Sequence, residues 1–322
     1  MREQIMSDSD SSHSSSDEDV SEPWGTLQSE IYLLNHYDSQ SPLPPSVQAR
    51  TLIKAYIRTQ HERIDEPVSP PAPTPQQLAF PKSWRPLSVR NLVTAERGVD
   101  LVVWVRTYYS PETDAKHAAL ISGIDIVMAI DSEERVLDDA SLYGGFGDHW
   151  EGLFELMPEL LDVGGTDGWY RARITEEVEL LQEARLRLQH GLDAVDATRE
   201  GKDKVGEMVE KYKTFLPEER VHQEVLDDLL DTVHRECVVK YIIIEDKTTL
   251  ECDESLVLLA FVDAWGRVVK SRRVTNSEAE QMSGMWFQHA FDETMTWDSA
   301  EIGNEYKGRD GWEDLLKDED SS

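Results

Sequence analysis

The chain has 322 residues, of which 32 are lysine or arginine and 64 are aspartate or glutamate, so its formal net charge is −32. Such a charge repels phosphate backbones and attracts basic proteins, so we expect basic protein partners and no nucleic acid. No apolar run approaches the roughly 20 residues that span a bilayer. The first 25 residues lack the features of a secretory signal, so we expect neither membrane insertion nor secretion.

Two cysteines, Cys237 and Cys252, are too few for a disulfide framework and favour a reducing compartment, namely the cytoplasm, the nucleus or both. The length suits about two domains, or one domain with extensions. The sequence leaves the oligomeric state open.

The first segment, residues 1–25, is an acidic, serine-rich tail with seven acidic residues and one basic residue. It carries too little apolar surface to offset the entropy of ordering, so we predict that it is disordered. Ser14, Ser15 and Ser16 each precede an acidic residue by three positions, the spacing that acid-directed kinases favour. These serines are candidate phosphorylation sites, and the alternative is an unmodified tail that keeps the chain soluble.

Residues 26–65 carry two helical patterns and form a predicted helical arm. The second helix, from about residue 46 to 64, places Ile53 and Ile57 on one face and carries four basic residues against one acidic residue. It is therefore a cationic amphipathic helix in an anionic protein. Residues 66–86 hold 7 of the 14 prolines and predict an extended linker, because proline fixes φ and removes a backbone donor.

A globular domain is predicted at residues 87–297. Its first part contains a β-branched and aromatic strand at 99–108, a helix that begins at 110–112 with an N-cap and a proline, and a buried strand at 124–130. Residues 131–148 have the composition of a loop.

A large helical insertion is predicted within that domain at residues 149–236. Amphipathic helices are expected at 149–161, from about 174 to 195, at 203–214 and at 218–236. Residues 149–235 contain 21 acidic and 11 basic residues, a net charge of −10, so the exposed surface of the insertion must be strongly negative.

The last part of the domain returns to strands. They are expected at 238–244, 256–262 and 267–274. The last two predict a β-hairpin with Gly266 in its turn, and Thr275 and Glu278 form a capping box that starts a helix. Residues 298–322 hold nine acidic and three basic residues and predict an acidic C-terminal tail.

This order of elements indicates the α/β class, with a mixed α+β fold as the alternative. A helical crossover joins parallel strands, whereas the hairpin adds antiparallel strands. We therefore predict one mixed β-sheet flanked by helices, with the helical insertion and disordered acidic tails.

The strongest candidates for catalysis are Glu245 and Lys247. A buried strand that ends in acid-x-Lys resembles the arrangement of metal-dependent nucleases, in which the acid binds Mg²⁺ and the lysine stabilises the charged transition state. That chemistry needs a second carboxylate on a preceding strand. The upstream acids lie on a helical pattern, however, and Asp263 follows the motif. The alternative is a strand end that is solvated by charged side chains.

Two other groups of residues give weaker signals. A zinc site could be drawn from His222, His234, Cys237 and Cys252, but only one pair has the spacing of structural zinc ligands. The glycine-rich loop at 144–149 precedes a helix and could hold an anion, but it lacks the lysine of a P-loop. A turn that ends in an aspartate N-cap is the alternative there. We therefore predict no metal and no cofactor.

These features favour a non-enzymatic interaction or regulatory protein that binds basic proteins through an anionic surface and is tuned by phosphorylation of its N-terminal serines. The alternative is a metal-dependent, nuclease-like hydrolase that uses Glu245 and Lys247. The sequence leaves open whether the chain is an enzyme.

Overall fold

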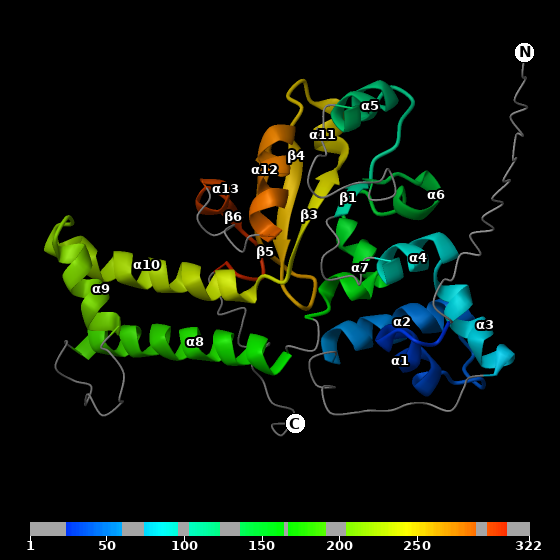
Figure 1. The fold of residues 1–322 in the computed structure, drawn as a ribbon, viewed down its shortest axis with the longest axis horizontal. Helices are drawn as coiled ribbons and strands as arrows, with labels where there is room; N and C mark the ends of the chain where they lie inside the picture. Colours follow the sequence, from blue (N-terminus) through cyan, green and yellow to red (C-terminus); the bar gives the residue numbers. More distant parts are fainter. Residues whose placement is uncertain are drawn as a thin grey trace, which may run out of the picture.

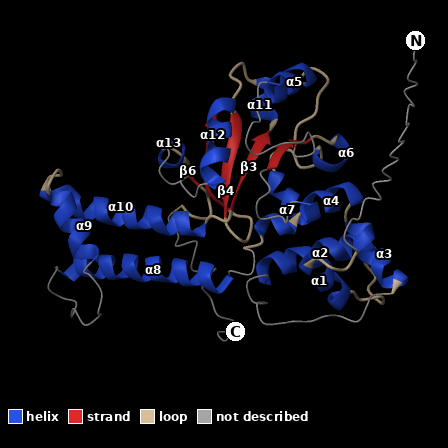
Figure 2. Cartoon of the chain, viewed as in Figure 1, coloured by secondary structure: helices blue, strands red, loops and turns tan. Residues whose placement is uncertain are grey.

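A six-stranded mixed sheet lies at the centre of the computed structural model, which describes residues 24–59, 74–95, 103–122, 136–163, 167–190, 204–287 and 295–307. Its strands are β1 (Val103–Arg106), β2 (Val136–Leu137), β3 (Lys240–Glu245), β4 (Val257–Val262), β5 (Val268–Val274) and β6 (Glu301–Ile302). Their order is β2-β1-β3-β4-β5-β6. Strands β2, β1 and β3 are parallel, and β3 to β6 are antiparallel. The predicted mixed sheet flanked by helices is thus confirmed (Figure 2).

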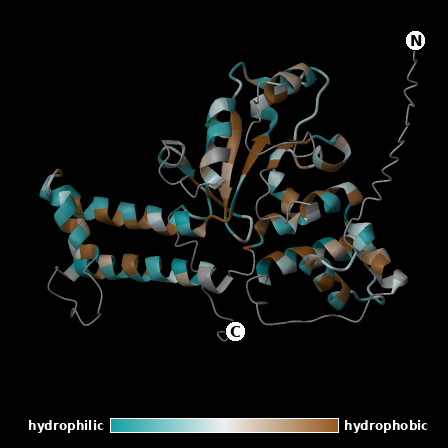
Figure 3. Ribbon diagram, in the orientation of Figure 1, coloured by the Kyte–Doolittle hydropathy of each residue, from teal (hydrophilic) through white to brown (hydrophobic). Residues whose placement is uncertain are grey.

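Alternate side chains of β3 enter two different cores. Tyr241 and Ile243 belong to one apolar cluster, and Ile242 and Ile244 belong to another on the opposite face. A strand that is buried on both faces is apolar throughout rather than alternating. This explains the continuous apolar run in the sequence and the hydrophobic colour of the central strands in Figure 3.

One face of the sheet packs against the helices of the second half of the chain, together with the helix that follows β1. These are α5 (Asp114–Ser122), α8 (Asp167–His190), α9 (Lys204–Lys213), α10 (Glu218–Cys237), α11 (Lys247–Glu251), α12 (Asn276–Phe287) and α13 (Met295–Asp298). Thr275 and Glu278 form the expected capping box at the start of α12. The predicted β4–β5 hairpin is confirmed, and Gly266 in its turn has φ of +73°.

The other face packs against the N-terminal helices and the short helices after β2. They are α1 (Gln28–His36), α2 (Pro45–Thr59), α3 (Pro75–Trp84), α4 (Leu87–Ala95), α6 (Ala140–Tyr143), the 3-10 helix η3 (Trp150–Gly152), α7 (Leu153–Leu156) and the 3-10 helix η4 (Pro158–Leu161). Ile53 and Ile57 of α2 share one apolar cluster with Ile242 and Ile244 of β3. The cationic helix therefore packs through its apolar face, and an ion pair from Lys54 to Glu155 at 3.0 Å adds to that contact.

Helix α3 contradicts the expectation of an extended linker over its residues. Pro75 begins the helix, where a missing N–H costs nothing, and Pro81 lies inside it. Burial of Phe80 and Trp84 offsets the interior proline, and the Trp84 indole donates to the Glu155 carbonyl at 2.7 Å. The proposed domain limits remain predictions, and the part of the linker at 60–73 lies outside the described residues.

Three other expectations about local structure were wrong. Residues 131–148 were expected to form a loop, but strand β2 and helix α6 lie within that range. Residues 150–161 form three short helices in place of one, because Pro158 begins a new turn. The predicted acidic tail begins too early, because β6 pairs with β5 and Tyr306 is buried. The expected strand at 124–130 and the two chain ends at 1–23 and 308–322 lie outside the described residues.

A buried ion network attaches α1 to the helices that follow it. The carboxylate of Glu30 is fully buried and accepts hydrogen bonds from Arg90 Nε at 2.6 Å and Arg85 Nη2 at 3.3 Å. Arg85 also donates to Glu159 Oε2 of η4 at 2.8 Å. Buried carboxylates are tolerated only when such partners are present.

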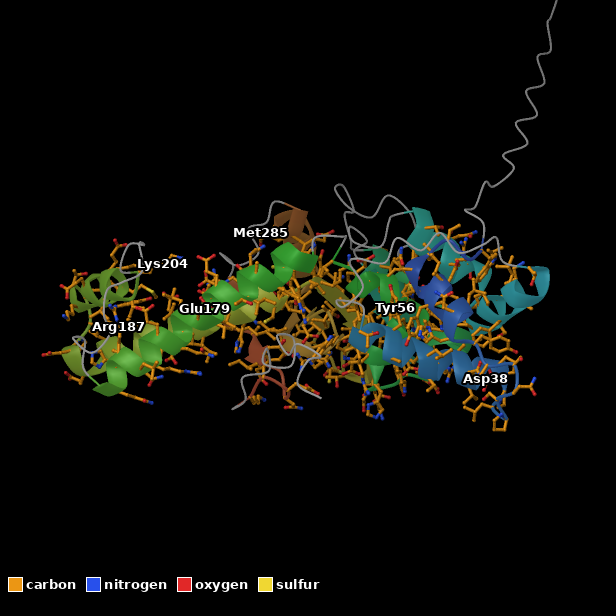
Figure 4. The ribbon with its side chains drawn as sticks, turned by 90° about the horizontal axis from the view of Figure 1, so that it is seen from below. Asp38, Tyr56, Glu179, Arg187, Lys204 and Met285 are labelled. Atoms are coloured by element: carbon orange, nitrogen blue, oxygen red, sulfur yellow. The ribbon has the colours of Figure 1, made fainter. Side chains whose placement is uncertain are left out.

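Helices α8, α9 and α10 project from one end of the sheet, with α8 running alongside α10 (Figure 1). We call residues 167–190 and 204–237 the projecting hairpin. Its interior contains the buried side chains of Ile174, Leu181 and Val225, as the apolar spacing predicts. Figure 4 shows Arg187 and Lys204 toward its far end, on the opposite side of the molecule from Tyr56 of α2. Among the described residues, no helix combines the length and apolar character that a membrane span requires.

Candidate functional site

The carboxyl ends of β1 and β3 meet at the point where the chain leaves the sheet in two directions. Strand β1 leads through α5 to β2 on one side, and β3 leads through α11 to β4 on the other. In open α/β sheets this topological switch point is where ligands bind. Arg106 ends β1 and Glu245 ends β3, and the two residues are register partners, so their side chains lie on the same face.

Glu245 is a fully buried carboxylate with a hydrogen-bond partner on each oxygen. Its Oε1 accepts the indole N–H of Trp104 at 2.5 Å, and its Oε2 lies 2.7 Å from Nδ1 of His117. Trp104 lies two residues before the register partner of Glu245 and on the same face of the sheet. The sheet geometry therefore positions the carboxylate, and α5 brings the imidazole to it.

His117 lies between two carboxylates. Its Nε2 lies 3.1 Å from Oδ2 of Asp138, which directly follows β2, while its Nδ1 faces Glu245. The hydrogen bond to Glu245 raises the pKa of His117 above its ordinary value of 6.5, and the negative charges of Glu245 and Asp138 act in the same direction. Burial and the charge of Arg106 oppose that rise.

Arg106 extends the network to the start of α5. Its guanidinium donates to Asp114 at 2.6 Å, to the Tyr108 carbonyl at 3.1 Å and more weakly to Asp138 at 3.5 Å. It also stacks over the ring of Tyr109 at 4.6 Å. Burial raises the pKa of the Tyr109 phenol, and the charge of Asp138 adds to that rise, so this phenol stays neutral.

Polar contacts carry much of the attachment of α5 to the sheet. Leu120 is its buried side chain, and burying one leucine stabilises by about 1.5–3 kcal/mol. A hydrogen bond to a charged group contributes about 1.5–3 kcal/mol. The hydrogen bonds of His117 are thus comparable in size to the apolar contact of α5, whereas the ion pair of Asp114 contributes less because the Asp114 side chain is 66% exposed.

This arrangement can hold a proton at His117 and orient the imidazole, as buried carboxylates do in catalytic pairs. Both ring nitrogens already face carboxylate oxygens, so neither is directed at a nucleophile. Across the described ranges, no group of three or more histidine, cysteine or acidic side chains has the arrangement of a metal site.

The structure places Glu245 and Lys247 in different surroundings. The side chain of Lys247 is 59% exposed, and its ammonium lies 3.8 Å from Glu251 and faces the ring of Tyr108. The carboxylate of Glu245, in contrast, is buried. Asp246 between them caps α11 through Thr249 and pairs with Arg273. The acid-x-Lys motif is therefore divided between the interior and the surface.

Asp263, the other acidic residue considered with the motif, lies at the opposite end of the sheet. Because β4 runs antiparallel to β3, Ile244 pairs with Leu258 near one end and Lys240 pairs with Val262 near the other. Asp263 is buried in the β4–β5 turn, where Arg267 Nε at 2.7 Å and the Tyr306 hydroxyl at 2.8 Å donate to its carboxylate.

The two cysteines considered for a zinc site are likewise separated, although His234 lies one helical turn before Cys237 on α10. Cys237 ends α10 before β3 begins, whereas Cys252 follows α11 at the far end of that strand. Six strand residues span roughly 20 Å. Burial raises the pKa of the Cys237 thiol, so it stays protonated and is unsuited to bind a metal.

The glycine-rich loop is a connection between short helices. Gly147 has φ of +52°, and His149, with no side-chain cap hydrogen bond, occupies the N-cap of the three-residue η3. The expected aspartate N-cap at Asp148 is thus wrong. Ser14, Ser15 and Ser16 lie outside the described residues, so their modification remains a prediction.

Sequence reasoning found Glu245 and missed both its partners, Trp104 and His117, and Asp138, which contacts the other nitrogen of His117. Trp104, His117 and Asp138 are 141, 128 and 107 residues away in the chain, and no short motif contains them. The one available signal was the charged residue at the end of each parallel strand. Comparison of the chain with models of protein families, with curated proteins and with solved structures finds no match.

Proposed function

We propose that this chain is a non-enzymatic interaction protein of the cytoplasm or nucleus that binds basic proteins through the projecting hairpin. The observation that carries the proposal is the position of α10, which extends away from the sheet (Figure 1) and is rich in acidic residues. Its 20 residues contain seven acidic and two basic side chains, a net charge of −5. Acidic surfaces attract basic partners and accelerate their association.

Three acidic side chains of α10 are available to such a partner. Glu218, Glu219 and Asp227 are exposed, and no ion pair joins them to a basic group within the described chain. Asp228 and Asp231 instead support the fold, because Tyr212 donates to the first and Lys270 pairs with the second. The exposed three are therefore the residues to change.

The test compares two triple charge reversals in the full chain. In the first, Glu218, Glu219 and Asp227 are each replaced by lysine. In the matched control the exposed acids away from the hairpin are replaced, namely Asp253→Lys, Glu254→Lys and Glu305→Lys. Each set changes the formal net charge from −32 to −26, so only the position of the change differs.

Binding of a lysine-rich peptide and affinity purification with mass spectrometry are both measured at about 0.1 M and about 1 M salt, where the Debye length falls from about 10 Å to about 3 Å. We expect captured proteins to be basic and lost at high salt, and the hairpin variant to bind several-fold more weakly than the control. Neutral or acidic partners that ignore salt contradict the proposal. Equal losses in the two variants contradict the assignment to the hairpin.

We further propose that phosphorylation of Ser14, Ser15 and Ser16 tunes this binding, since each phosphate adds about −1.5 to −2 charges. Phosphosite mapping of the same purified sample tests it. The metal-dependent hydrolase receives no support from the described residues, because Lys247 is exposed beside Glu251 whereas the carboxylate of Glu245 is buried against Trp104.

A further inference from the structure

His117 has two hydrogen-bonding nitrogens, and each faces a carboxylate oxygen, Glu245 at 2.7 Å and Asp138 at 3.1 Å. A carboxylate only accepts hydrogen bonds, and a neutral imidazole has one N–H. In either neutral tautomer one nitrogen lone pair would therefore point at a carboxylate oxygen. The imidazolium, with an N–H on both nitrogens, satisfies both contacts at once.

The charged groups around the imidazole ring of His117 come from three strands and from α5 itself. Arg106 comes from β1, Asp138 follows β2, Glu245 ends β3, and Asp114 lies on α5 itself. Arg106 is held by Asp114 at 2.6 Å and lies 3.5 Å from Asp138. With His117 protonated, this set holds two positive and three negative charges. Without that proton it holds one positive and three negative charges in a half-buried site.

We propose that His117 is a pH-sensitive clamp that, when protonated, holds α5 over the carboxyl ends of β1 and β3. Loss of the proton turns one of its two hydrogen bonds into a repulsive contact. Leu120 is the buried side chain of the helix and Ile121 packs against the same core, so the hydrogen bonds of His117 are comparable in size to the apolar contact that holds α5. Deprotonation therefore loosens α5 and admits solvent to the end of the sheet that carries Arg106 and Glu245.

The direction of the pH dependence follows from the pKa of His117, which Glu245 raises above 6.5. A group whose pKa is higher in the folded state stabilises fully below its unfolded pKa and loses that contribution as the pH rises through the folded value. The clamp is therefore closed below about pH 6.5 and opens as the pH rises through the higher pKa of the folded protein.

The test is amide hydrogen exchange of α5 in the full chain, expressed as protection factors at about pH 6 and about pH 9 so that the intrinsic rate cancels. We expect α5 to lose protection on the order of tenfold at the higher pH, while β3 and β4 keep theirs. In H117Q, α5 should be poorly protected at both pH values. The matched control is H222Q, which replaces an exposed histidine of α10 and should behave like the wild type.

A second variant and a spectroscopic measurement keep the proposal testable if H117Q folds poorly. Asp138 is 36% exposed, so D138N should fold normally, lower the pKa of His117 and shift the loss of α5 protection to lower pH. Nitrogen-15 NMR of the imidazole should show both nitrogens protonated at about pH 6. A neutral ring at that pH, or equal α5 protection at both pH values in the wild type, would overturn the proposal.

Discussion

Trp104 donates its indole N–H to the buried carboxylate of Glu245 at 2.5 Å, across the parallel pairing of β1 and β3. This hydrogen bond occupies one carboxylate oxygen and leaves the other for His117. A buried carboxylate is costly unless both oxygens are satisfied. The pairing of two strands therefore prepares the position that α5 occupies.

Replacing Glu245 by glutamine should lower the free energy of unfolding by about 1–3 kcal/mol at about pH 6. The amide can still accept from Trp104, but it cannot pair with the imidazolium of His117. The difference in free energy of unfolding between the variant and the wild type should become smaller as the pH rises, because neutral His117 can accept a hydrogen bond from the new amide. Urea unfolding at several pH values measures this, and a deficit that does not depend on pH would contradict it.

The neighbouring substitution Lys247→Ala should change the free energy of unfolding by less than about 0.5 kcal/mol, because the ammonium is exposed and its contact with Glu251 is long. The same unfolding experiment serves as the measurement. A loss as large as that of the Glu245 variant would mean that the two residues act together after all.

Replacing Glu30 by glutamine should cost about 3–5 kcal/mol, because Arg85 and Arg90 would remain buried beside a neutral group. Glu155→Gln is the matched control: its ion pair with Lys54 is partly exposed, so we expect less than about 1 kcal/mol. Denaturant titration of both variants decides the matter, and equal losses would argue against the buried network as the source of stability.

Gly303→Ala should be severely destabilising, by about 3 kcal/mol or more. A Cβ at that position would lie 1.8 Å from the backbone oxygen of Val268, which cannot rotate away. Gly145→Ala is the control, because nothing lies within 4 Å of its added atom. Thermal unfolding should give a much lower melting temperature for Gly303→Ala than for Gly145→Ala. Similar melting temperatures would show that β6 is not held as described.

The two cysteines should differ in reactivity on the order of 100-fold or more in the folded protein. Cys252 is exposed, whereas Cys237 is buried, and burial raises the pKa of its thiol. Timed alkylation with iodoacetamide and mass spectrometry should label Cys252 first and Cys237 only on unfolding. Equal labelling rates would mean that the end of α10 opens readily.

The sequence by itself determined most helices and strands, because their signals are local. The apolar spacing of Ile174 and Leu181 predicted α8, and the capping box at Thr275 predicted the start of α12. Gly266 predicted the hairpin turn, which needs a positive φ. Proline misled the prediction at residues 75–84, where burial of aromatic side chains outweighed local preference.

Only the tertiary structure decided which charged residues meet. Glu245 and His117 are 128 residues apart, and Glu30 and Arg90 are 60 apart, so no local pattern links either pair. A charged residue in the sequence gives the same signal whether it ends up solvated or buried against a partner. The outcome depends on strand order, on register and on the packing of α5, because these determine which charged side chains are buried next to each other.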